Sequence, residues 1–160
     1  DVYKRQAEVD QIVRDTYDNG KTTYIRLSDH PHKVDTNLEV GKGTIIRHSD
    51  SSKFCVITAG PLLPNVIEAL DGLDVSILYF HTIKPLDIEL LETYSSKTFV
   101  VIHDAFGLKE MIQRYMHVPV YYHGVSDEFL SCYGTMEQVR ESIGLDVNGI
   151  KSYVSKLIGS

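Results

Sequence analysis

Histidine is the first residue type in this chain that suggests chemistry, because a neutral imidazole binds transition metals and titrates near neutral pH. The chain has seven histidines, and none of them belongs to a His-Glu-x-x-His pattern. His30 and His32 flank Pro31, but no third ligand accompanies them at the spacing of a zinc site. We therefore expect no metal site in this chain.

Three polar residues follow two apolar runs that are typical of buried strands. His81 comes directly after residues 75–80, and His103 and Asp104 come after residues 98–102. The carboxyl ends of parallel strands share one edge of a sheet, and ligands bind at that edge. One interpretation is that the three side chains line a substrate cleft or a subunit interface. The other is that they cap their strands and bond loop backbone, as polar side chains in loops often do.

Neither a reactive thiol nor a phosphate-binding loop is indicated. Cys132 and His123 lie nine residues apart, and nothing in the sequence provides the electropositive surroundings that a reactive thiol needs. We expect Cys132 to lie half-buried in a loop. Gly41-Lys42-Gly43 is too short to match either common phosphate-binding pattern, so we expect it to form a turn.

The composition narrows the class of protein. Apolar residues make up 42% of the 160 residues, as in globular domains. The net charge is −6, and the 16 Lys and Arg are scattered, which argues against nucleic acid as a partner. No apolar run reaches the length of a membrane span. Two cysteines are too few for a disulfide framework, so we expect a cytoplasmic protein that does not contact membranes.

Strand-like and helix-like segments alternate along most of the chain. Continuous apolar runs with β-branched residues predict strands, and apolar residues at helical spacing predict helices. The expected strands are residues 22–27, 44–47, 54–59, 75–80, 98–102 and 118–122, and the expected helices are 9–17, 62–70, 86–94, 108–116, 136–143 and 147–158. This alternation predicts an α/β fold, a mostly parallel open sheet with helices on both faces.

The composition changes sharply between residues 28 and 37. This stretch contains Asp, His, Pro and Asn and almost no apolar residue, which is typical of a linker. We therefore expect three parts: the tail of a preceding domain (residues 1–27), a linker (28–38) and a sheet domain (39–160). The chain does not begin with Met, so we expect it to be part of a longer protein or a split subunit.

Five segments together resemble the C-terminal portion of transketolase-type enzymes, which depend on thiamine diphosphate and include transketolases and deoxyxylulose-phosphate synthases. Each segment alone is a weak signal, and their order and spacing make the resemblance. They are residues 23–28, 39–43, 56–60, 81–87 (HTIKPLD, the most specific) and 124–129, the last followed by Gly144-Leu145-Asp146 and Gly149-Ile150.

The resemblance implies a supporting role for this chain. In the family, magnesium and thiamine diphosphate bind between a diphosphate-binding domain with a GDG motif and a pyrimidine-binding domain with a catalytic Glu. This chain has no GDG, and residues 1–27 correspond only to the end of the pyrimidine-binding domain. We therefore expect no catalytic residue and no cofactor bound by this chain alone. Its partners would be those two domains, in the same chain or a separate subunit, and the assembly would be a homodimer.

The HTIKPLD segment is expected to have a structural role and not a catalytic one. Pro85 fixes its own φ and pushes Lys84 toward extended geometry as a helix begins. Asp87 then lies near the N-terminus of that helix, where a carboxylate is favourable. We expect Lys84, Pro85 and Asp87 to form a structural motif.

Two departures from the family concern the substrate. Relatives often carry an Arg that contacts the substrate phosphate at the place of Asp29, and a carboxylate there repels phosphate. Relatives often carry a glycine pair after the third buried strand, where this chain has Gly107 alone. Asp29 and His30 join the three edge residues as substrate-cleft candidates.

The expected activity of the complete enzyme is transfer of a two-carbon ketol unit between sugar phosphates, with the isolated chain inactive. Two alternatives remain open. The chain could be a fragment of the beta subunit of a 2-oxo acid dehydrogenase, or a non-catalytic interaction module that keeps only the sheet domain. The HTIKPLD segment favours the transferase or synthase, whereas Asp29 favours the module.

Overall fold

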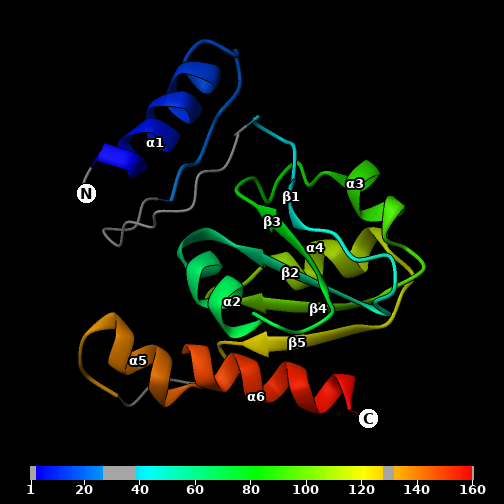
Figure 1. Ribbon diagram of the computed structural model, residues 1–160. Helices are drawn as coiled ribbons and strands as arrows, with labels where there is room; N and C mark the ends of the chain where they lie inside the picture. Colours follow the sequence, from blue (N-terminus) through cyan, green and yellow to red (C-terminus); the bar gives the residue numbers. More distant parts are fainter. Residues whose placement is uncertain (1–2, 27–38, 128–131, 160) are drawn as a thin grey trace.

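A single five-stranded sheet organises the chain, and its strands run in the order β1-β3-β2-β4-β5 (Figure 1). The computed structural model describes residues 3–26, 39–127 and 132–159, and the side chains from residue 9 onward. The strands are β1 (Thr44–Arg47), β2 (Phe54–Ala59), β3 (Ser76–Phe80), β4 (Thr98–His103) and β5 (Val120–Gly124). Neighbours among β2, β3, β4 and β5 pair in parallel, and β1 runs antiparallel to β3 at one edge.

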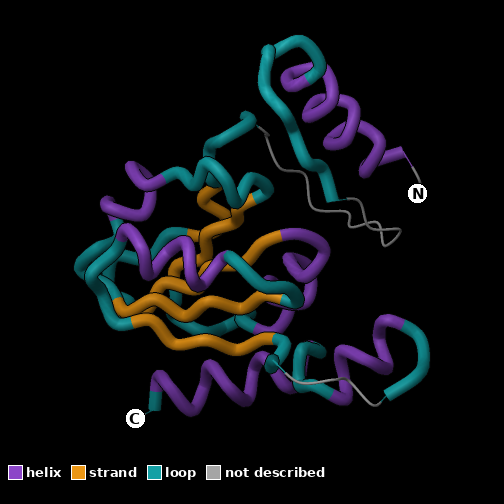
Figure 2. The backbone as a smooth tube through the Cα atoms, turned by 180° about the vertical axis from the view of Figure 1, so that it is seen from behind, coloured by secondary structure: helices purple, strands orange, loops and turns teal. Residues whose placement is uncertain are grey.

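Apolar side chains on both faces explain why the central strands stay buried. One core cluster contains Ile57, Phe80 and Val101 and lies under α3 (Ile88–Thr93) and α4 (Leu108–Tyr115). The other contains Val56 and Ile102 and lies under α2 (Leu63–Ala69) and α6 (Val147–Ile158). Alternate side chains of one strand thus point into the two core clusters on opposite faces of the sheet. Figure 2 shows the helices on the two sides of the sheet, and the predicted fold class is confirmed.

The short connections complete the sheet domain. A 3-10 turn, η1 (Gly60–Leu62), leads from β2 into α2, and α5 (Met136–Ser142) precedes α6. α3 begins at Ile88, later than the predicted residue 86, because the Asp87 side chain caps the helix by accepting a hydrogen bond from Leu90 N. Pro85 therefore precedes the helix and does not form its first turn. β5 ends at Gly124, two residues beyond the predicted strand.

The N-terminal part contains one helix, α1 (Tyr3–Thr16), which Figure 1 shows to one side of the sheet. The strand predicted for residues 22–27 is wrong for its described part, since residues 22–26 form no strand. β-branched residues favour extended backbone, but a strand also needs a partner's hydrogen bonds. Tyr17 and Tyr24 are 87% and 88% exposed. The predicted linker, with Asp29 and His30, lies outside the described residues.

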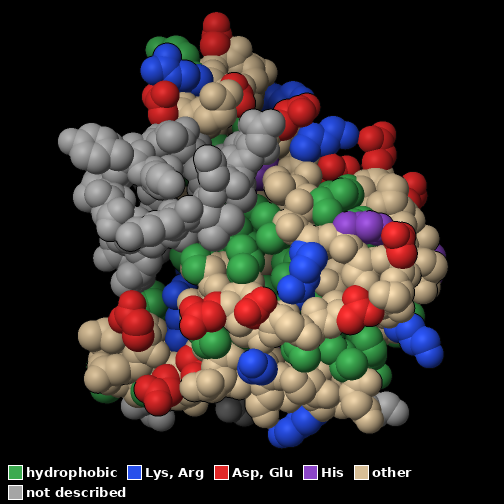
Figure 3. Space-filling model, viewed as in Figure 1, with side chains coloured by type: hydrophobic (Ala, Val, Ile, Leu, Met, Phe, Trp, Pro, Cys, Tyr) green, Lys and Arg blue, Asp and Glu red, His purple; other side chains and the backbone are tan. Residues whose placement is uncertain are grey.

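Charged side chains of both signs are interspersed on the face shown in Figure 3. In the part of the chain that the structure describes, no helix has both the length and the apolar character needed to cross a membrane.

Candidate functional site

The connections that follow β2 and β4 cross opposite faces of the sheet. These strands are parallel neighbours, with Thr58 opposite Ile102 near their carboxyl ends. The chain leaves β2 into α2 on one face and leaves β4 into α4 on the other. In open α/β sheets, ligands bind outside the carboxyl ends of strands at such a switch point. We call this region the carboxyl edge and build the candidate site from its residues.

His103 is the last residue of β4 and is almost completely buried, with 5% of its surface exposed. Its Nδ1 is buried without a hydrogen-bond partner. Burial lowers the pKa of the His103 imidazole, and the charge of Arg26 lowers it further, whereas Asp104 and a backbone hydrogen bond with Ala105 oppose the shift. His103 is therefore held in its neutral form across a wider pH range than an exposed histidine.

Asp104 follows His103 and forms an ion pair with Arg140 of α5. Arg140 Nη2 lies 3.0 Å from Asp104 Oδ2, and the two side chains are 9% and 15% exposed. Arg140 Nε is buried without a partner. Arginine is rarely buried unless it is paired, so this contact is what allows α5 to place a charged side chain against the carboxyl edge.

His81 lies further along the same edge. It follows β3, and β2 separates β3 from β4 in the sheet. Adjacent strands lie about 4.8 Å apart, so His81 and His103 follow strands that are about 10 Å apart. The structure thus places His81, His103 and Asp104 at the same edge of the sheet, with His103 and Asp104 adjacent at the end of β4. Asp29 and His30 lie outside the described residues.

Two polar groups of the carboxyl edge were missed from the sequence. Arg140 pairs with Asp104, which lies 36 residues earlier in the chain, and no local sequence pattern predicts such a pairing. Thr58 is completely buried on β2, and its Oγ1 has no hydrogen-bond partner. The sequence signal for Thr58 is its position one residue before the end of a strand that is buried on both faces.

The remaining titratable candidates have structural partners elsewhere. His123 Nε2 donates to the Gly144 carbonyl at 2.7 Å, and its ring stacks on Tyr153. Cys132 is partly exposed, as predicted, and Ser142 Oγ donates to its sulfur at 3.1 Å, so Cys132 and His123 do not form a nucleophile pair. Burial raises the pKa of the Cys55 thiol to about 12, which keeps it unreactive.

The HTIKPLD segment and the Gly41-Lys42-Gly43 turn form one structural unit. Asp87 Oδ2 accepts a hydrogen bond from Gly43 N at 3.0 Å, and Thr82 Oγ1 accepts one from Gly41 N at 3.2 Å. Lys42 lies 3.1 Å from Glu89 and 4.0 Å from Asp87. Asp87 is 8% exposed. These contacts hold the turn against the N-terminus of α3.

A divalent metal has no candidate ligand set in the described residues: no three His, Cys, Asp or Glu side chains come together there. The described carboxyl edge offers the imidazoles of His81 and His103 and the paired carboxylate of Asp104, which can position or recognise a polar group.

Known proteins resemble the chain in sequence. It is 28% identical over 134 residues to the 1-deoxy-D-xylulose-5-phosphate synthase of Vibrio atlanticus, covering 75% of this chain and 21% of that protein. It is 30% identical over 129 residues to the same enzyme of Vibrio vulnificus, covering 74% of this chain and 20% of that protein. The chain thus spans about a fifth of the length of these relatives. No protein-family model matches it.

Solved structures of transketolases have a similar fold. A split-gene transketolase, described as an inactive beta4 tetramer, matches with a TM-score of 0.65 and 21% identity, covering 81% of this chain and 46% of that chain. The chain is therefore distantly homologous to 1-deoxy-D-xylulose-5-phosphate synthases and has a transketolase-like fold. The fraction of those enzymes that it spans is consistent with a C-terminal domain.

Proposed function

We propose that this chain is the C-terminal domain, or a split C-terminal subunit, of a thiamine-diphosphate-dependent transketolase-type enzyme that transfers a two-carbon ketol unit between sugar phosphates. In this proposal the chain supports the assembly and its homodimer, performs no catalysis alone, and works in the cytoplasm. The observation that carries the proposal is the sequence match to 1-deoxy-D-xylulose-5-phosphate synthases across about three quarters of this chain.

A hydrogen bond between two of the motif segments supports the same proposal. The 39–43 and 81–87 segments resemble the family separately, and Asp87 joins them through its hydrogen bond to Gly43. A shared structural unit explains why both segments occur in one chain. Since both consist of turn and helix-cap contacts, their role is to shape the domain.

The cofactor belongs to the other domains in this proposal. Among the described residues, no three His, Cys, Asp or Glu side chains come together as ligands for its magnesium. We assign no step of the reaction to a side chain of this chain. Thiamine diphosphate supplies the carbanion chemistry when it is bound, and the partner domains would hold it.

The carboxyl edge is the surface that we propose faces those partner domains. The charge of Arg26 contributes to lowering the pKa of the His103 imidazole, which supports a position of Arg26 near this edge. Asp29 and His30 follow three and four residues later in the chain. In the proposal they join His81, His103 and Asp104 along the substrate cleft of the complete enzyme.

The test is to purify the complete assembly, from the gene that encodes this chain together with its flanking or neighbouring coding sequence. Ketol transfer is then assayed with thiamine diphosphate and magnesium, with and without residues 39–160. We expect activity only when these residues are present. If the assembly binds no thiamine diphosphate, or is equally active without them, the proposal fails and the interaction-module alternative is favoured.

A further inference from the structure

α5 differs from its neighbours in what it buries. Among the described helices α2 to α6, it alone buries no apolar side chain, and its one buried residue is Arg140. Val139 is half-buried, and Met136 at the start of the helix is 40% exposed. Apolar burial is what normally holds a surface helix in place, and α5 has little of it: Ile143, at its C-terminal end, is partly buried against the core under α2 and α6.

The buried side chain of α5, Arg140, forms an ion pair with Asp104. Both side chains are mostly buried, so forming the pair removes two charges from water, and this cost offsets most of the attraction between them. Arg140 Nε is also buried without a hydrogen-bond partner. This adds to the free-energy cost of keeping α5 packed against the carboxyl edge. A helix of seven residues is far too short to be stable alone. These costs reduce the net stability that the ion pair gives to the packed position of α5.

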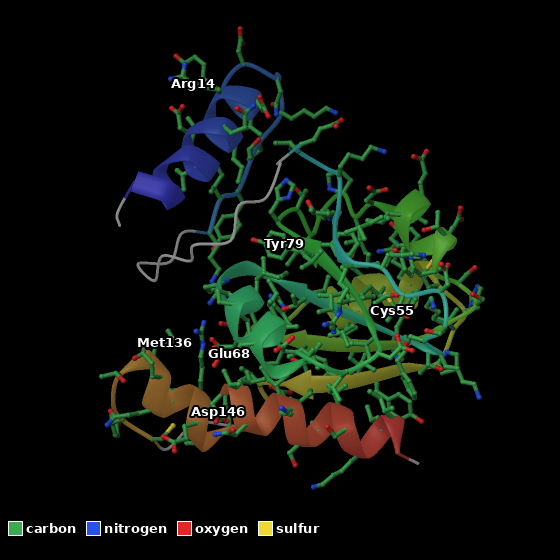
Figure 4. The ribbon with its side chains drawn as sticks, viewed as in Figure 1. Arg14, Cys55, Glu68, Tyr79, Met136 and Asp146 are labelled. Atoms are coloured by element: carbon green, nitrogen blue, oxygen red, sulfur yellow. The ribbon has the colours of Figure 1, made fainter. Side chains whose placement is uncertain are left out.

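The C-terminal end of α5 is anchored much more firmly. Leu145 is completely buried, and its carbonyl accepts a hydrogen bond from Asn65 of α2 at 3.3 Å. Gly144, at φ +71°, makes the turn between α5 and this anchor. Figure 4 shows Met136 and Asp146, which mark the starts of α5 and α6. Movement of α5 would therefore be limited by a fixed point at Leu145.

We propose that the Arg140–Asp104 pair is a latch, and that α5 opens from the carboxyl edge as a separate unit when the pair is broken. Figures 1 and 2 both show α5 beyond the carboxyl end of β5, beside the edge where Asp104 lies. Opening exposes the Asp104 carboxylate and the Arg140 guanidinium at the switch point of the sheet. The latch is a property of this chain and does not depend on the proposed function.

Amide hydrogen exchange of the full chain tests the latch. The probes are the N–H groups of Val139 and Ile143, which donate to Thr135 O and Val139 O. The reference is the N–H of Ile150 in α6, which donates to Asp146 O. We expect Val139 and Ile143 to exchange at least tenfold faster than Ile150, because α5 opens without unfolding of the core.

Substitutions of the pair give the decisive comparison. Asp104→Asn and Arg140→Met should each accelerate exchange at the α5 probes at least tenfold and leave Ile150 within twofold. The double variant should be no faster than the faster single variant, because both changes break one contact. The matched control is Glu89→Gln, which breaks the exposed pair with Lys42 and should leave α5 unchanged.

Three results would overturn the latch. In the first, the wild-type α5 probes exchange as slowly as the Ile150 reference. In the second, neither single variant accelerates them. In the third, the variants accelerate Ile150 to the same extent, which would show that the pair stabilises the whole domain. Circular dichroism of each variant establishes that it is folded, and if Arg140→Met does not fold, Asp104→Asn alone decides.

Discussion

The carboxylate of Asp87 connects Gly43 to the start of α3. Its Oδ2 accepts a hydrogen bond from Gly43 N at 3.0 Å, and its Oδ1 accepts one from Leu90 N at 3.2 Å. One side chain thus satisfies two backbone donors that lie 47 residues apart in the sequence (90 − 43). Because Asp87 is 8% exposed, water replaces these bonds poorly, and their loss has a measurable cost.

Replacing Asp87 tests this connection. Asp87→Ala removes the cap of α3 and leaves Gly43 N without its acceptor, so we expect the free energy of unfolding to fall by about 2 kcal/mol or more. Urea denaturation measures the change. Asp87→Asn keeps an oxygen that can accept from Leu90 N and should lose less. Equal stability of Asp87→Ala and the wild type would contradict the role of Asp87.

Gly43 is required for a different reason, namely the space around it. A Cβ at this position would lie 2.6 Å from Leu90 Cδ2 and 2.7 Å from Phe80 Cε1. Gly43→Ala should therefore destabilise the domain by about 1–3 kcal/mol through overpacking. Adding Leu90→Ala removes one of the two clashes and should recover part of the loss in a double-mutant cycle. Additive losses in the double variant would show that the clash with Leu90 is relieved in some other way.

His103 makes stability depend on pH. Its pKa in the folded protein is lowered below 6.5 chiefly by burial, so the unfolded chain binds the proton more readily. Stability therefore falls as the pH drops through about 6.5, and this loss ends once the pH is below the folded pKa. We expect the urea midpoint of His103→Gln to fall less than that of the wild type between pH 7.5 and 5.5. Parallel pH profiles of the two proteins would refute this assignment.

The domain boundary remains a prediction from the sequence. Residues 28–37 have the composition of a linker, and exposed linkers are preferred sites of proteolysis. Limited trypsin or thermolysin digestion should cut in or beside this stretch first and leave a stable core that begins near residue 39. N-terminal sequencing and mass spectrometry identify the product. Earlier cleavage within the sheet domain would mean that the boundary is misplaced.

The sequence alone determined most elements of the sheet domain. Residues 54–59, 75–80 and 98–102 are apolar almost throughout, and only strands buried on both faces accommodate such runs. Helices between them predicted parallel strands, which Figure 1 shows for β2 to β5. The position of Asp87 near the N-terminus of a helix was also evident locally, because a carboxylate is favourable there, although the sequence placed the helix start at residue 86 and the structure makes Asp87 its cap. These features depend on residues that are close in the sequence.

Only the tertiary structure decided which distant groups meet. Residues 22–26 have strand propensity but pair with no strand, whereas the short β1 pairs antiparallel with β3. Arg140 reads as an exposed helical residue in sequence, yet it is buried against Asp104. The physical reason is that pairing and burial depend on how the strands order themselves and how the helices pack on them. Local propensity carries no information about contacts between residues 36 positions apart.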